Sequence, residues 1–134
     1  MKHSKAKAKK PQAKKEKDTP DTRWDRLARE IFMTLLKRRP SLATELGVHD
    51  FDTELPDPSR EGVREDIHLA HEWLTRVEAV KPGPLSPDRA VDRLLAIHFL
   101  RLELFDLEVC ETWKHNPNAA EIAAYSVLPL FVHE

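Results

Sequence analysis

The chain has 134 residues and a formal net charge of −1, with three glycines, ten prolines and one cysteine. This length allows a single domain; the absence of an apolar run of about 20 residues excludes a membrane span, and the lone Cys110 excludes an internal disulfide. Leu, Ala, Glu and Arg dominate the body and alternating runs of Val, Ile and Thr are missing, so we expect an all-α fold class.

The lysines gather at the start of the chain. Residues 1–17 hold eight lysines and one glutamate, whereas the remainder holds 14 basic and 22 acidic residues. Residues 1–22 contain no large apolar side chain after Met1, so we predict a disordered Lys-rich tail over 1–22 and a helical region over 23–134. No apolar segment of an export signal follows the basic start, which favours a cytoplasmic protein.

The first apolar period predicts a helix that is capped by Thr22 and ended by Pro40. Its expected buried face comprises Trp24, Leu27, Ala28, Ile31, Phe32, Leu35 and Leu36. A short helical turn over 42–46 follows and stops at Gly47.

Residues 47–58 have no helical period and are rich in Asp and Pro, which predicts an ordered loop with Asx-type turns. We expect its apolar side chains to anchor it, namely Val48, Phe51 and Leu55. Ser59 is the expected cap of a second helix that extends to Val80, with Trp73 at the margin of its buried face. That face comprises Val63, Ile67, Ala70, Leu74 and Val77.

Residues 81–85 form a linker, and Ser86 followed by Pro87 is a strong start signal for a third helix over 87–114. One apolar stripe on it comprises Val91, Leu94 or Leu95, His98, Leu102, Phe105 and Val109. Further apolar residues point in other directions, namely Ile97, Leu100, Leu104 and Leu107. A helix that is apolar on several faces is typical of a central helix between neighbours, and we expect Cys110 to be an inert core residue.

The last part of the chain, residues 119–132, is almost entirely apolar. A segment of this composition needs a partner surface, so we interpret the chain as the front part of a larger protein. The expected partner of the helical region is a missing C-terminal region or another helical chain.

Several short motifs occur in a recognisable order. Residues 40–52 read PSLATELGVHDFD, residues 55–59 read LPDPS, and residues 101–105 read RLELF before Trp113 and Asn116-Pro117. In their order and spacing these motifs resemble the N-terminal part of the bacterial domain-of-unknown-function 885 family over residues 24–134.

This resemblance implies a mostly helical parent, several times longer than this chain and similar to thermolysin-like zinc metallopeptidases, with a peptide substrate. The zinc ligands of such a parent lie far downstream on a His-Glu helix. We do not expect His133-Glu134 to be that motif, because it lies soon after the Asn116-Pro117 landmark and the His-Glu helix of the family comes much later. We therefore predict no catalytic, cofactor-binding or metal residue in this chain, which we expect to be inactive alone.

Other polar constellations have a structural and a functional interpretation. His68 and His71 are three residues apart on one helix, a spacing at which both could bind the same metal ion, but no third ligand is evident. His98 is expected to be a hydrogen-bonded core histidine. The acidic loop residues Asp50, Asp52, Glu54 and Asp57 lack the pattern of a calcium loop, so capping is favoured, while His49 to Asp52 could have a structural or cleft-facing role.

Three functional hypotheses follow. The first is the N-terminal portion of a metallopeptidase-like hydrolase, which would wall or cover the substrate cleft. The second is a helical protein-protein interaction module that self-associates or binds another chain through Tyr125, Leu128, Leu130 and Phe131. The third is weak, salt-dependent binding of nucleic acid by the Lys-rich tail, which the absence of Arg and aromatic residues from the tail disfavours.

Overall fold

The structure is a computed structural model that describes residues 17–115. This range contains helices and no strand, which confirms the all-α fold class. Three long helices form its frame: α1 (Pro20–Arg38), α3 (Arg60–Ala79) and α4 (Pro87–Leu104). The predictions made for residues 1–16 and 116–134, including the apolar segment 119–132, lie outside the described residues.

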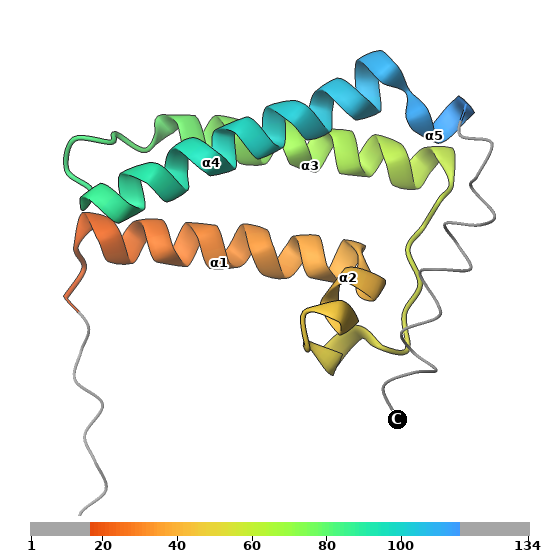
Figure 1. Cartoon of the computed structure of the whole chain (residues 1–134), viewed down its shortest axis with the longest axis horizontal. Coiled ribbons are helices and arrows are strands. Elements are labelled where there is room, and N and C mark those ends of the chain that lie inside the picture. The colour runs from red at the N-terminus through yellow and green to blue at the C-terminus, as the bar shows by residue number, and fades with distance from the viewer. Residues whose placement is uncertain (1–16, 116–134) are drawn as a thin grey trace, which may run out of the picture.

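The long helices make a hairpin with a third helix beside it. α3 and α4 lie side by side and antiparallel, and α1 runs along the pair in the same direction as α4 (Figure 1). Four short elements complete the description: α2 (Pro40–Glu45), η1 (His49–Phe51), η2 (Phe105–Cys110) and α5 (Thr112–His115).

α1 begins one turn earlier than the sequence predicted. Its cap is Thr19, not Thr22, because the two threonines form a reciprocal capping box. The Thr22 backbone N–H donates to Thr19 Oγ1 over 3.2 Å, and the Thr19 N–H donates to Thr22 Oγ1 over 2.8 Å. Pro20 fits the first helical position, where its missing N–H costs nothing. At the other end, the helix stops at Arg38 and Pro40 opens α2, as the proline predicted.

The main core lies where the three long helices meet. It comprises Trp24, Trp73, Val77, Leu85, Ile97 and Leu100. The expected marginal position of Trp73 is wrong, since its side chain is buried against this cluster. Leu55, expected as a loop anchor, is 72% exposed. Ser59 caps α3 as predicted, with its Oγ accepting from the Gly62 N–H over 3.0 Å.

The third helix is not continuous to Lys114. After Leu104 it widens into the π-helical turn η2, and Glu111 adopts a left-handed conformation with φ of 46°. Such a residue ends a helix, and α5 starts directly after it. Trp113 Nε1 donates to the Leu107 carbonyl over 3.1 Å and the Thr112 hydroxyl donates to Asp106 over 2.9 Å, so polar contacts hold α5 against the turn.

Of the apolar faces that the sequence offered on α4, the core takes the one opposite the stripe. Ile97, Leu100 and Leu104 enter the core, whereas the stripe residues are exposed on the opposite side. His98 and Cys110 are also exposed, so their predicted core positions are wrong. The helix carries two apolar faces, and helical periodicity alone does not rank them.

Ion pairs tie α1 to the hairpin along its length. Arg76 of α3 makes a two-pronged contact with Glu30, with distances of 2.7 and 2.8 Å. Near the start of α1, Arg89 of α4 lies 2.7 Å from Asp25. At its end, Arg38 of α1 pairs with Asp66 of α3, with side chains that are 23% and 34% exposed. These contacts set the orientation of α1, while the apolar core supplies the burial.

Candidate partner-binding groove

An apolar groove runs between α1 and α4 and is closed at one end by α2. Its volume is about 390 Å³. The lining side chains are nearly all apolar: Trp24, Ala28, Ile31, Phe32, Leu35, Arg39, Leu42, Val77, Ala96, Phe99 and Leu100. A concave apolar surface of this size is typical of a site that receives side chains from a partner.

The groove follows from the helical period of α1. Ala28, Ile31 and Leu35 lie three or four residues apart and therefore share one face of the helix. Ala28 on α1 and Ala96 on α4 both line the groove, and their small side chains leave space between the helices. The same period put Phe32 on the expected buried face, yet it is 45% exposed at the edge of the groove.

Two phenylalanines form the rims. Phe32 on α1 and Phe99 on α4 are about half exposed, although both line the groove. Half-buried aromatic side chains offer a large apolar area at little additional conformational cost, because part of each side chain is already packed. Phe99 belongs to neither of the apolar sets predicted for this helix, and its own large apolar side chain was the signal for it.

The only charged side chain in the groove lining is neutralised. Arg39 pairs with Glu103 of α4. The pair joins the end of α1 to α4 at the closed end of the groove. The remaining wall carries no charge, so the groove suits an apolar ligand group and offers no general acid, base or nucleophile.

The loop residues singled out in the sequence form a small polar cluster elsewhere. Asp52 accepts a hydrogen bond from the Thr44 hydroxyl over 2.7 Å and pairs with His49 Nδ1 over 2.8 Å. The Thr44 hydrogen bond, followed by that of His49, lowers the pKa of Asp52. This contact leaves His49 Nε2 outside the pair, an arrangement found in histidine bases and metal ligands.

No further reactive group joins that cluster. Asp50 is exposed, Phe51 is half-buried, and the residues of 17–115 contain no group of three His, Cys, Asp or Glu side chains that could hold a metal. The cluster instead fastens the end of α2 to η1. Asp57 has the capping role that the sequence favoured, with its carboxylate accepting the Ser59 N–H over 3.0 Å.

The histidines on the helices lie apart from the groove lining. His71 Nε2 pairs with Glu108 over 3.0 Å and links α3 to η2, while His68 is exposed on α3. His98 Nδ1 donates to the Leu94 carbonyl over 2.8 Å, so its hydrogen bond is local to α4. Neither pattern brings three ligands together within residues 17–115.

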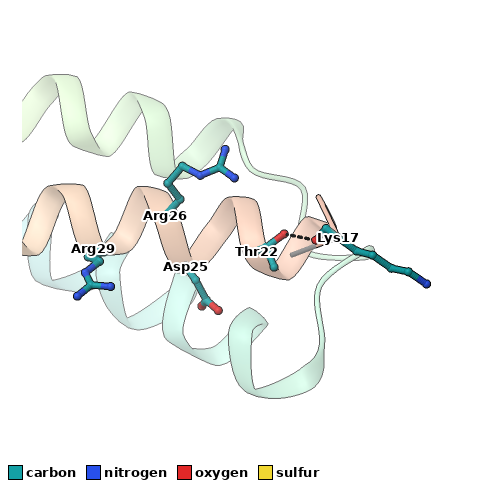
Figure 2. Close-up of a pocket in the computed structure, with 5 residues that line it drawn as sticks. All are labelled: Lys17, Thr22, Asp25, Arg26 and Arg29. Atoms are coloured by element: carbon teal, nitrogen blue, oxygen red, sulfur yellow. Dashed lines mark hydrogen bonds between the residues drawn. The ribbon is translucent and has the colours of Figure 1, made fainter. Parts of the chain in front are cut away.

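A second concavity, of about 400 Å³, lies at the start of α1 and is polar. Lys17, Thr22, Asp25, Arg26 and Arg29 line it. Figure 2 shows the side chains of Arg26 and Arg29 extended in different directions. The cationic groups therefore do not converge on one point, as recognition of a phosphate or carboxylate would require.

Comparison of the chain with protein-family models, curated proteins and solved structures finds no match. Within residues 17–115, no helix has both the length and the apolar composition needed to cross a membrane.

Proposed function

We propose that this chain is a noncatalytic helical docking module, whose groove between α1 and α4 receives the apolar face of a partner helix. The observation that carries the proposal is the groove itself, with Phe32 and Phe99 half exposed at its rims. An amphipathic helix laid into an apolar groove places residues at i, i+3 or i+4 and i+7 into it.

The two phenylalanines at the rims contribute apolar area that a bound helix would bury. Completing the burial of one half-exposed phenylalanine contributes roughly 1 kcal/mol, because full burial of a large apolar side chain contributes about 1.5–3 kcal/mol. Several such contacts, with the partner's own apolar side chains, offset the loss of translational and rotational freedom on association. The proposal therefore makes Phe32 and Phe99 the main contributors to affinity.

Selection of helical peptides on the full chain tests this function. We expect enrichment of peptides with the i, i+3 or i+4, i+7 apolar spacing. We expect Phe99→Ala to weaken the selected binders about tenfold, the equivalent of about 1.4 kcal/mol. Leu55→Ala is the matched control, because Leu55 is an exposed apolar residue outside the groove lining. Equal loss with both variants, or binders indifferent to Phe99, would refute the groove as the docking site.

A second proposal concerns the parent protein. The order of motifs over residues 40–59 and 101–117 supports the N-terminal portion of a domain-of-unknown-function 885 protein, a peptidase-like hydrolase with zinc beyond this chain. In that setting the partner of the groove is another part of the same protein. No step of the zinc chemistry is assigned to the residues present.

The gene sequence and the mass of the native protein test the proposal about the parent protein. Reading on past codon 134 should reveal a His-Glu-x-x-His-like segment in frame or after a frameshift. Intact mass and zinc analysis of the native protein should give a zinc-containing product much larger than 15.5 kDa. A metal-free product that ends at Glu134 would remove the peptidase-like parent and leave the docking module.

A further inference from the structure

The outer face of α4 is a second apolar surface, separate from the groove. Its stripe runs along the side of the helix that faces away from Ile97 and Leu100. The exposed members are Val91, Leu94, Leu95 and Leu102 on α4 and Phe105 and Val109 on η2, each between 51% and 67% exposed. Single exposed apolar residues are ordinary, but a row of them along α4 and η2, which also contains the exposed His98, marks a surface that another apolar group covers.

The sequence holds a segment of matching character directly after the described residues. Eleven of the 14 residues of 119–132 are apolar, and Glu121 is the only charged one. Such a segment is poorly solvated and gains free energy wherever it meets an apolar surface.

The connection places this segment at one end of the stripe. α5 ends at His115 and is held to η2 by the Trp113–Leu107 hydrogen bond, so the chain leaves beside the Phe105–Val109 end of the stripe. The stripe from Val91 to Val109 spans roughly 27 Å at 1.5 Å per residue. Fourteen residues span about 21 Å as a helix and about 46 Å when extended, so the segment is long enough to run back along α4.

Tethering favours this occupant over a separate chain. A short linker holds the segment at an effective concentration on the order of millimolar, far above that of a second copy in dilute solution. Across an antiparallel pair of α4 helices, Asp88 and Asp92 near the start of the stripe would approach Asp106 near its end on the second copy, whereas the segment brings a single charge.

We propose that residues 119–132 of the same chain pack on the outer face of α4 and cover the stripe. The inference is independent of the proposed function, because no residue of the stripe lines the groove. It gives the apolar end of the sequence a partner surface within this chain.

The test is amide hydrogen exchange of the full chain, with its sedimentation measured over a concentration series. We expect a monomer in which the amides of 119–132 are protected. Leu102→Glu should lower that protection at least tenfold, because it places a charge in the contact. The matched control Leu55→Glu should leave it unchanged, since Leu55 is equally exposed and lies on the 47–58 loop.

Leu102→Gln serves as a second variant and should produce a smaller loss of amide protection in 119–132. The helical circular dichroism of both variants should show that the helices remain folded. A monomer whose 119–132 amides are unprotected, or are protected to the same degree in Leu102→Glu, would overturn the proposal. So would a concentration-dependent dimer that Leu102→Glu dissociates, which would assign the face to a second copy. Binding of the selected peptides to the groove depends on Phe99 and not on Leu102. Failure of the docking function and failure of this inference are therefore distinguishable.

Discussion

The glycine at position 62, in the first turn of α3, is required by a close contact with the preceding loop. A Cβ atom at this position would lie 2.4 Å from the Asp57 carbonyl oxygen and 2.8 Å from its Cγ. The loop that precedes α3 therefore folds back against the first turn of the helix, and only a residue without a side chain permits that approach.

Gly62→Ala should destabilise the chain by about 1–3 kcal/mol, because either the backbone of the loop or the first turn of α3 must move. Chemical denaturation followed by circular dichroism measures the change. Gly83→Ala is the control: its added Cβ meets nothing within 4 Å, and we expect a gain of about 0.4–1 kcal/mol from the reduced freedom of the unfolded chain. Equal effects at the two positions would contradict the close approach.

Arg38 joins two elements through one side chain. Its guanidinium donates to Asp66 over 2.7 Å, to Glu65 over 2.8 Å and to the Gly62 carbonyl over 2.8 Å, and the Asp66 hydrogen bond raises the pKa of Arg38. The side chain is only 23% exposed, so its partners lose their hydrogen bonds with little compensation from water when it is removed.

We expect Arg38→Met to cost about 1–3 kcal/mol, as measured by the midpoint of urea denaturation. Arg26→Met is a suitable control on the same helix, because Arg26 is 74% exposed and lies 3.8 Å from its partner Asp18. Its expected effect is within about 0.5 kcal/mol. A cost for Arg26→Met as large as that for Arg38→Met would show that charge alone, and not the shared contact, is responsible.

At the scale of elements, α1 depends on Trp24 for its attachment to the α3–α4 hairpin. Trp24 is 3% exposed and belongs to the core cluster formed with both other long helices. Trp24→Ala should cost about 3–5 kcal/mol, a large fraction of the stability of a small domain.

The matching control is Phe32→Ala on the same helix, which should cost less than about 1.5 kcal/mol because Phe32 is already 45% exposed. Thermal unfolding by circular dichroism distinguishes the two variants. If they shift the midpoint equally, α1 is held by the edge of the groove and not by the core.

For the whole molecule, carboxylates that accept hydrogen bonds make stability depend on pH. Their pKa values are lowered below the ordinary 3.8 of Asp or 4.5 of Glu, at Asp21, Glu30, Asp52 and Asp57. The Ser86 backbone N–H is the largest cause at Asp21, and the Arg76 hydrogen bond is the largest at Glu30. Because each folded-state pKa is below the unfolded one, this stabilisation is complete above the unfolded values and is lost as pH falls through the folded ones.

We therefore expect the urea midpoint to be insensitive to these groups at neutral pH and to fall below about pH 4. Asp21→Asn should reduce the acid sensitivity, since the amide oxygen can still accept the Ser86 N–H but no longer titrates. Asp50→Asn is the control. An unchanged pH profile in Asp21→Asn would show that this contact does not contribute to acid unfolding.

The sequence by itself determined the helices, because caps, prolines and apolar spacing act within a few residues of one another. The structure has the helix boundaries predicted at Ser59, Ser86 and Pro40. The start predicted at Thr22 is one turn too late, because Thr19 caps the helix and forms a capping box with Thr22. The break of the last helix at Glu111 was not predicted, since a left-handed glutamate carries no local signal.

Only the tertiary structure decided which face of each helix is buried. The pattern on α4 offers two apolar faces of similar strength, and contact with α3 and α1 selects Ile97 and Leu100 over the stripe. The same packing buries Trp73, leaves Phe32 half exposed and creates the groove, whose lining comes from residues more than 60 positions apart. Periodicity defines a face, but burial depends on which neighbours arrive there, and that information is distributed over the whole chain.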